Sequence, residues 1–361
     1  MNILFVGPHL RYNVMTPERE PLGGSESCLC YAARALAERG HAVTVLLSLP
    51  LATPEMLAGV RHAPKVQGNN KAFFDAGAFD AIVTLNAPDS ASRFRDMSPN
   101  SVHVSWMQMM PGQLTASELP VADCSIYVSR TQRDIFPPGP PAYVIGNGIA
   151  PAFENMFGSV GELRAAKRNR GAYTSTPFRG LGMLIAIMER TKADIEVDVY
   201  SSMRVYQGVE DNYVAMYQHI QRTPRMYLRG SLPQPVLAER LRQTGFLCYP
   251  CGFAETYCIA ASEAIAAGLE VISTDLGALK ETTLGYAALL PFDEKTTQAI
   301  DYINGYCALL EKHVAAYKNE PQAWAEKRFA QSQEINRRCS WKARAKEWED
   351  TLAAAVATKR S

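Results

Sequence analysis

Residues 249–275 read YPCGFAETYCIAASEAIAAGLEVISTD, and this stretch decides the fold class. It starts at the end of a short apolar run, residues 246–250, that is typical of a buried strand. The residues from near Thr256 or Tyr257 to Ala267 predict a helix that ends at a glycine, and residues 270–275 form a second strand-like run. A strand, a helix and a strand in direct succession predict a βαβ unit with parallel strands.

Two glutamates, Glu255 and Glu263, lie within this unit among small and apolar residues. Acidic side chains are seldom buried without partners. On the predicted helix, Glu263 is rotated by roughly 80° from Glu255, and the first N–H groups, around Tyr257 and Cys258, favour an anion. Two carboxylates that hold sugar hydroxyls, with phosphates between them, describe a nucleotide-sugar site. The alternative is a helix cap plus a buried, hydrogen-bonded glutamate.

Strand-like runs alternate with helical patterns along the whole chain. The first series ends near residue 147, residues 150–171 contain no strand-like run, and a second series then begins. This pattern predicts two doubly wound α/β domains of similar size. The predicted strands are residues 3–7, 41–48, 81–86, 101–107, 124–129 and 142–147, then 171–175, 195–201, 225–230, 246–250, 270–275 and 286–291.

Composition narrows the classes of partner. The chain has 361 residues, of which 47% are hydrophobic and 20% charged, so each domain can build its own core. A formal net charge of +1 argues against nucleic acid or an acidic membrane surface as the main partner. No apolar run approaches the ~20 residues that span a bilayer, and the start lacks a signal-peptide pattern, so we expect a cytoplasmic protein. The basic cluster at residues 164–170 predicts a solvated helix face or linker, with an anion site as the alternative.

The eight cysteines do not predict a disulfide framework in a chain of this length without an export signal. Cys248 and Cys251 form a C-x-x-C pair, which in some proteins is a redox dithiol. Here Gly252 and Phe253 follow the pair where a redox motif would open a helix, and a zinc site would lack further ligands. Small apolar residues at a strand end are the favoured interpretation.

The loop after the first predicted strand carries a glycine pair. The strand continues as GPHLRYN, which is not G-x-G-x-x-G and argues against a nicotinamide-dependent enzyme. The loop closes in PLGGSES, with Gly23 and Gly24 directly before a helix predicted from Ser25. Glycines let a backbone approach a ligand closely. A flexible turn with a helix cap explains the pair equally well.

The order and spacing of these motifs resemble the retaining glycosyltransferases of family four. That family has the GT-B arrangement, with two Rossmann-like doubly wound domains facing across a cleft. The resemblance spans nearly the whole chain, and its most specific part is E-x7-E, here Glu255 to Glu263. The other matching motifs are ILFVG (3–7), GGSE (23–26), GHAV (40–43), SIYVSRTQRD (125–134), IGNGI (145–149) and AIAAGLEVI (264–272).

Carried over residue by residue, the resemblance implies a donor site. Glu263 would hold the ribose hydroxyls of the nucleotide, and Glu255 would contact the transferred sugar as a catalytic residue. The other implied positions are the backbone of Thr256, Tyr257 and Cys258 at the sugar and diphosphate, and Gly23 and Gly24 at the diphosphate.

The family also places an arginine and a lysine after the first strand of the second domain, where they neutralise the diphosphate. Here Ser175 stands at the first place and Arg179 at the second. One of the two cations is therefore missing, and Arg168 or Arg170 is the candidate to compensate for it.

A histidine of the first domain is expected near the reacting sugar. The stretch SVHVSWMQMM offers His103 and Gln108 as candidates. A histidine inside a strand is more often a satisfied core residue, and that interpretation stands beside a catalytic role for His103.

The resemblance implies metal-independent hexosyl transfer, with retention at the anomeric carbon, from a nucleotide-diphosphate sugar to a glycan, a lipid-linked glycan or a small molecule. No metal cofactor is expected, because no D-x-D motif stands in a suitable place. Residues 1–150 would form the acceptor-side domain and 151–338 the donor domain, and a helix at 339–361 would cross back to the first. The alternatives are a nucleotide- or carbohydrate-binding protein descended from a transferase, and a sugar-nucleotide epimerase.

Overall fold

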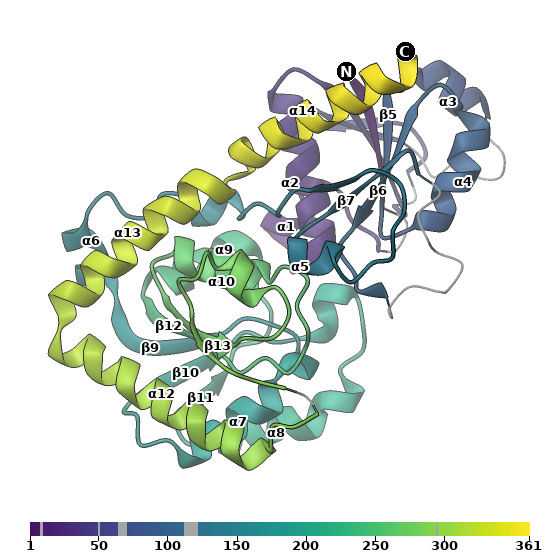
Figure 1. The fold of residues 1–361 in the computed structure, drawn as a ribbon. Helices are drawn as coiled ribbons and strands as arrows, with labels where there is room; N and C mark the ends of the chain where they lie inside the picture. The colour runs from purple at the N-terminus through teal and green to yellow at the C-terminus, as the bar shows by residue number, and fades with distance from the viewer. Residues whose placement is uncertain (8–9, 50, 64–70, 112–121, 294) are drawn as a thin grey trace. The chain divides into compact units, whose positions relative to one another are not determined.

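The computed structural model describes residues 1–361 except 8–9, 50, 64–70, 112–121, 294 and the side chains of 88–92. The chain divides into two compact units (Figure 1). The first comprises Met1–Gly148 together with Trp341–Ser361, and the second comprises Ile149–Ser340. The chain therefore passes between the units twice.

The first unit is built on an eight-stranded sheet in the order β3-β4-β2-β1-β5-β6-β7-β8. Neighbouring strands are parallel, except that β3 pairs antiparallel with β4 at one edge. The central strands are short apolar runs because both faces of a parallel sheet are covered. The strands are β1 (Asn2–Gly7), β2 (Ala42–Leu47), β3 (Glu55–Leu57), β4 (Val60–Ala63), β5 (Ala81–Leu85), β6 (Val102–Met107), β7 (Cys124–Tyr127) and β8 (Ala142–Val144).

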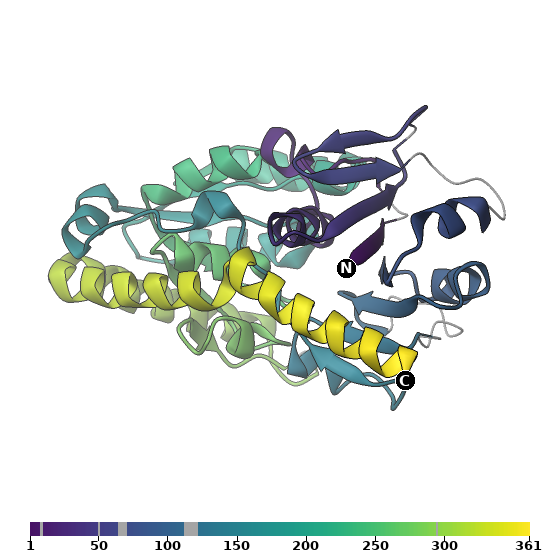
Figure 2. The same cartoon turned by 90° about the horizontal axis from the view of Figure 1, so that it is seen from above.

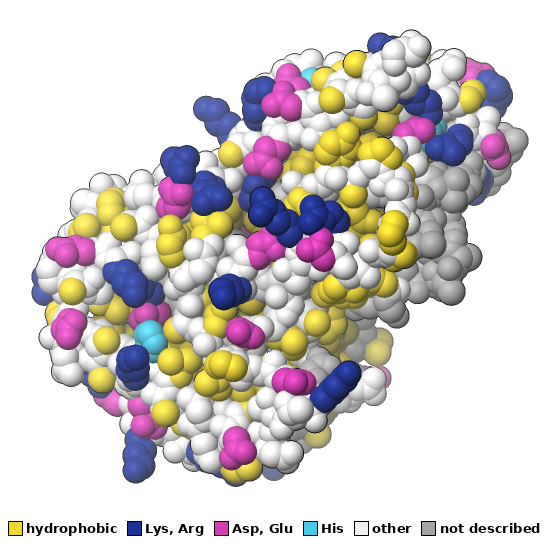
Figure 3. All heavy atoms as spheres, viewed as in Figure 1, with side chains coloured by type: hydrophobic (Ala, Val, Ile, Leu, Met, Phe, Trp, Pro, Cys, Tyr) yellow, Lys and Arg dark blue, Asp and Glu magenta, His cyan; other side chains and the backbone are white. Residues whose placement is uncertain are grey.

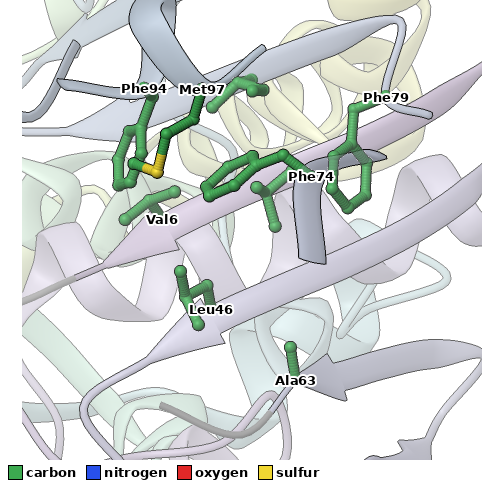
Figure 4. Packing of buried hydrophobic residues seen from close by; sticks show 9 residues of the cluster. Val6, Leu46, Ala63, Phe74, Phe79, Phe94 and Met97 are labelled. Carbon is green, nitrogen blue, oxygen red and sulfur yellow. The ribbon is translucent and has the colours of Figure 1, made fainter. Parts of the chain in front are cut away.

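Alternate residues of β1 face different helices, as the two-residue period of a strand requires. Val6 packs in a cluster with Leu46, Phe74 and Phe94, so that α3 and α4 cover this face of the sheet (Figure 4). Phe5 faces the other way, toward the C-terminal helix. The helices of this unit are α1 (Thr16–Arg19), α2 (Gly24–Glu38), α3 (Lys71–Gly77), α4 (Pro88–Met97), α5 (Arg130–Arg133) and α14 (Trp341–Arg360).

Helix α14 completes the core of the first unit. Its Trp348 is buried, with ring centroids 5.9 Å from Phe5 and 4.8 Å from Trp106. The helix packs beside α2, and both ends of the chain belong to this unit (Figure 2). Ion pairs fasten it further, and these are Arg39–Glu349, Lys359–Asp123 and Arg360–Asp80.

The second unit is built on a six-stranded sheet in the order β11-β10-β9-β12-β13-β14, with neighbouring strands parallel throughout. The prediction of two α/β units with parallel sheets is confirmed. The strands are β9 (Arg168–Tyr173), β10 (Glu196–Val199), β11 (Met226–Leu228), β12 (Thr244–Tyr249), β13 (Glu270–Thr274) and β14 (Ala288–Leu290).

A buried carboxylate, Glu270, ties two long helices of the second unit to β13. It accepts hydrogen bonds from His313 Nδ1 and Trp324 Nε1, both at 2.8 Å, and pairs with Arg328 Nη1 at 3.0 Å. Burial raises the pKa of Glu270, but these partners outweigh it and hold the pKa below its ordinary value. The helices of this unit are α6 (Val160–Ala166), α7 (Leu181–Arg190), α8 (Val214–Arg222), α9 (Gln234–Arg242), α10 (Ile259–Ala266), α11 (Leu279–Thr282), α12 (Ala299–Asn319) and α13 (Pro321–Cys339).

The basic cluster at residues 164–170 is the predicted solvated face only in part, because Arg164 and Arg168 are exposed but Lys167 is not. Strand β9 begins at Arg168, inside the cluster. Lys167 is buried, and its Nζ donates to the carbonyl oxygens of Leu241 at 3.0 Å and Ala267 at 2.5 Å. These carbonyls lie at the ends of α9 and α10, where intrahelical donors are lacking. Burial lowers the pKa of Lys167 well below its ordinary value, and the side chain caps two helices.

The surface seen in Figure 3 carries basic and acidic side chains side by side, in keeping with the formal net charge of +1. Among the helices that the structure describes, none combines the length and the apolar character needed to cross a membrane.

Candidate functional site

The loop between β12 and α10 carries the first of the two predicted glutamates. Helix α10 begins at Ile259, later than the predicted start near Thr256 or Tyr257. The reason is the backbone of Cys258, which has a φ of +63° and ends the extended loop before the helix can start. Thr256, Tyr257 and Cys258 therefore precede the helix instead of forming its first turn.

Glu255 is held by two donors on one carboxylate oxygen. Its side chain is buried, and Oε1 lies 2.6 Å from Arg179 Nη1 and 2.5 Å from the hydroxyl of Tyr249. The thiol of Cys251 lies 3.9 Å from the same oxygen. The structure thus brings together Glu255 and Arg179, which the sequence assigned to sugar and diphosphate separately.

The backbone of Glu255 is fixed from the neighbouring loop after β13. Its carbonyl accepts a hydrogen bond from the N–H of Ala278 at 2.8 Å, and the residue forms a parallel bridge with Gly277. Gly277 has a φ of +64°, and a Cβ there would lie 2.4 Å from the Glu255 carbonyl oxygen. Only glycine fits this position without displacing the loop.

Arg179 lies in the turn after β9 and is braced by aromatic rings. Its guanidinium lies 4.2 Å from the ring centroid of Phe253 and 5.5 Å from that of Phe178. Burial lowers the pKa of Arg179, but the Glu255 carboxylate outweighs burial, and the pKa is raised above its ordinary value. Arg179 is therefore a permanent cation that neutralises a buried carboxylate.

Ser175 continues this network without adding charge. Its Oγ lies 3.5 Å from the Tyr249 hydroxyl, which in turn bonds Glu255. The proposed compensating cations are engaged elsewhere. Arg170 pairs with Asp198 and Glu196 in the sheet, and Arg168, at the amino end of β9, donates to backbone carbonyls.

Glu263 has a different environment from Glu255. It is buried on α10, where Oε1 accepts from the N–H of Ala150 at 3.0 Å and lies 3.5 Å from Gln234 Nε2. Burial raises its pKa to about 8, although the Ala150 N–H works in the opposite direction. Glu263 therefore holds a proton at neutral pH, and one short segment supplies two carboxyl groups in two electrostatic settings.

The predicted residues of the first unit are placed as follows. Gly23 is the N-cap of α2 and Gly24 is its first residue, one position before the predicted start at Ser25. The glycines thus occupy a helix start at the loop after β1. They belong to the first unit, whereas Glu255 and Glu263 belong to the second.

His103 lies near the amino end of β6, with its ring buried and Nε2 at 2.9 Å from the carbonyl oxygen of Ser98. Burial lowers its pKa. This setting favours the core-histidine interpretation. Gln108 lies at the opposite, carboxyl end of β6, where its N–H donates to Asn86 Oδ1 at 2.7 Å and its Oε1 accepts from Asn147 Nδ2 at 3.0 Å.

The C-x-x-C pair lies in the core of the second unit. Cys248 and Cys251 are both free and buried, and burial raises the pKa of each thiol to about 12. Such thiols are poor nucleophiles at neutral pH, which supports the apolar interpretation of the pair. Within the described part of the chain, no three His, Cys, Asp or Glu residues cluster as a metal site would require.

The architecture resembles solved glycosyltransferase structures. Sucrose-phosphate synthase from Thermosynechococcus elongatus matches over 99% of this chain and 99% of its own, with a TM-score of 0.75 and 16% identity. The chain has the GT-B fold. HepE from Anabaena in complex with UDP and glucose matches over 98% and 100%, with a TM-score of 0.69 and 16% identity. A glycosyltransferase from Rickettsia africae matches over 98% of each chain, with a TM-score of 0.70 and 13% identity.

At this level of identity the likeness concerns the GT-B fold alone. No family model matches the chain. No curated protein matches it either.

Three residues that hold Glu255 and Arg179 have no motif in the sequence. Tyr249 ends β12 and bonds Glu255, Phe253 stacks on Arg179, and Gly277 receives the Glu255 backbone. A tyrosine at the end of a buried apolar strand and a glycine shortly after the next strand are the signals that could have directed attention to two of them. Neither signal shows that the partner of these two residues is Glu255.

Proposed function

We propose that this protein is a retaining glycosyltransferase that moves a hexosyl group from a nucleoside-diphosphate sugar to a hydroxyl acceptor without a metal ion. One observation carries the proposal: in a GT-B fold, the buried Glu255 lies in the loop between the carboxyl end of β12 and α10, and the buried Glu263 lies on α10 itself. In open α/β sheets, ligands bind outside the carboxyl ends of the strands. Because HepE structures contain UDP or UDP-glucose, uridine donors are the first to test.

The protonation of Glu263 suits a hydroxyl ligand. A protonated carboxyl group donates one hydrogen bond and accepts others, so it can pair with two neighbouring hydroxyls of a ribose. The raised pKa of about 8 supports this role, because the group carries no charge at neutral pH that would repel the nearby phosphates. The Ala150 N–H that now bonds Glu263 fixes the orientation of the carboxyl group.

The proposed reaction breaks the bond between the anomeric carbon and the β-phosphate oxygen. The acceptor oxygen bonds to the same face of that carbon, and the acceptor proton passes to the leaving phosphate. Negative charge on the diphosphate would be met by Arg179 and by the N–H groups at the start of α10. Glu255, which Arg179 and Tyr249 hold, would contact the sugar.

A thermal-shift panel tests the donor class. UDP, ADP, GDP, CDP and UDP-glucose are each added with and without EDTA, because a ligand that binds the folded state raises its melting temperature. We expect a shift with one base that EDTA leaves unchanged. Glu263→Ala should remove this shift, whereas Glu239→Ala, at an exposed position on α9, should preserve it. If none of the nucleotides shifts the wild type, the proposal is wrong.

Proton NMR of slow donor hydrolysis tests the stereochemistry. Water replaces the acceptor, so retention predicts that the first sugar released has the anomeric configuration of the donor. The opposite anomer would contradict retention. A sugar-nucleotide epimerase would change a different carbon, and a binding protein descended from a transferase would release no sugar.

A further inference from the structure

The strong hydrogen bonds to the Glu255 carboxylate fall on one of its two oxygens. Oε1 accepts from both Arg179 and Tyr249, at 2.6 and 2.5 Å. The thiol of Cys251 also lies on this side, 3.9 Å from Oε1. Among the described residues, the side-chain hydrogen bonds to Glu255 thus converge on one carboxylate oxygen.

Arg179 uses little of its donor capacity. A guanidinium has five N–H donors, and among the described residues only Nη1 is engaged, by Glu255. The guanidinium also lies 4.2 Å from the ring centroid of Phe253, and its remaining N–H groups are the donors that can meet an anion. A phosphate bound there competes with Glu255 for the same positive charge.

Tyr249 is placed to offset that competition. Its ring is buried at the end of β12, packs 5.7 Å from the ring of Tyr173, and cannot turn away from Glu255 without leaving the core. Its hydroxyl also meets Ser175, which stands where the family resemblance expects the first cation. The second strong donor to Glu255 is therefore a neutral hydroxyl, and a hydrogen bond to a charged group is stronger than one between neutral groups.

We propose that Tyr249 is a positioning residue that shares the charge of Glu255 and thereby leaves Arg179 available to the diphosphate of the donor. The inference rests on the proposed function, because it assigns Arg179 to a phosphate group. Tyr249 itself touches neither phosphate nor sugar; it acts through Glu255. When the Tyr249 hydroxyl is removed, Arg179 is the one strong donor left to the buried Glu255 carboxylate. A phosphate that binds Arg179 then has to compete with that carboxylate directly.

A double-mutant cycle read by calorimetric binding tests this role. Inorganic pyrophosphate and UDP are titrated into the wild type, Tyr249→Phe, Glu255→Gln and the double variant. We expect Tyr249→Phe to weaken both ligands about tenfold in the wild-type background. In the Glu255→Gln background, where no carboxylate needs holding, the same change should alter affinity less than twofold. Tyr306→Phe is the matched control, because it removes another buried hydroxyl of this unit, one that donates to the Ile272 carbonyl at 2.7 Å.

The possible outcomes separate the inference from the proposed function. Equal affinity in wild type and Tyr249→Phe overturns the inference alone. An equal loss in both backgrounds also overturns it, because that pattern marks a general packing defect, which the melting temperatures and Tyr306→Phe would reveal. If the wild type binds neither pyrophosphate nor UDP, the inference and the diphosphate assignment of the proposed function fail together.

Discussion

The backbone N–H of Ala150 donates to Oε1 of Glu263 at 3.0 Å, although the two residues are 113 positions apart in sequence. The start of the second unit thus touches the middle of α10. This bond is the polar contact that offsets part of the cost of burying Glu263, whose pKa nevertheless rises to about 8.

Glu263 should make stability depend on pH in a defined direction. Its pKa is raised from 4.5 to about 8 on folding, so the folded state binds a proton that the unfolded state releases. The stabilisation is complete below pH 4.5 and is lost as pH rises through 8, by at most about 1.4 kcal/mol per pH unit. Between pH 5 and 8 the unfolding free energy of the wild type should therefore fall relative to Glu263→Gln. Parallel curves for the two proteins in urea unfolding would contradict the shifted pKa, and Glu239→Gln serves as the exposed control.

Removing the partner of Glu255 should be costly. Arg179→Gln leaves a buried carboxylate with only Tyr249 as a strong donor, and breaking such pairs costs about 3 kcal/mol. The variant should unfold at a lower urea concentration, and Arg179→Gln combined with Glu255→Gln should recover part of the loss. Arg190→Gln, at an exposed position on α7, should change stability by less than about 0.5 kcal/mol. If Arg179→Gln and the double variant unfold at the same urea concentration as the wild type, the ion pair contributes nothing to stability.

Gly277 offers a test of the loop that holds the Glu255 backbone. Gly277→Ala adds a Cβ 2.4 Å from the Glu255 carbonyl, at a φ of +64°. Gly285→Ala is the matched control, since its φ is +74° but nothing lies within 4 Å of the added Cβ. Both variants lose about 1–2 kcal/mol through backbone strain, but Gly277→Ala alone should reduce the affinity for UDP-glucose relative to UDP. Calorimetry with the two ligands measures the difference, and an equal effect in Gly285→Ala would contradict the role of Gly277.

Trp348 should be central to the first unit. Its ring packs against Phe5 and Trp106, and truncation of a buried tryptophan costs about 3–5 kcal/mol. Trp348→Ala should lower the melting temperature of the first unit, whereas Lys346→Ala, exposed on the same helix, should leave it unchanged. Hydrogen exchange of β1 and β6 amides locates the effect, and unchanged protection there would show that α14 is dispensable.

The alternation of strands and helices was readable from the sequence because each central strand is a short apolar run with clear turn signals. The Glu255–Glu263 segment could be assigned to one βαβ unit for the same reason. The start of α10 was misplaced, because no propensity rule anticipates a left-handed Cys258. Within the basic cluster, the surface position expected for Lys167 was wrong, because its side chain is buried between two helix ends that the sequence does not show to be neighbours.

The contacts that hold Glu255 could not be predicted, for a physical reason. Arg179 follows β9, Tyr249 ends β12 and Gly277 follows β13. All three contact Glu255 because those strands are neighbours in the sheet. Strand order is a tertiary property that local patterns do not encode. The two glutamates of the segment could be identified from the sequence, but the residues that contact Glu255 could not.

The place of α14 has a consequence for the order of events on the ribosome. The second unit is continuous in sequence, from Ile149 to Ser340, whereas the first contains both Met1–Gly148 and Trp341–Ser361. Synthesis proceeds from the N-terminus, so all residues of the second unit have been synthesised before Trp348 can contact Phe5 and Trp106. Contacts of such long sequence separation form late. The earlier-synthesised part of the protein is therefore expected to be the last to acquire its native core, and to depend on chaperones while its α14 face stays open.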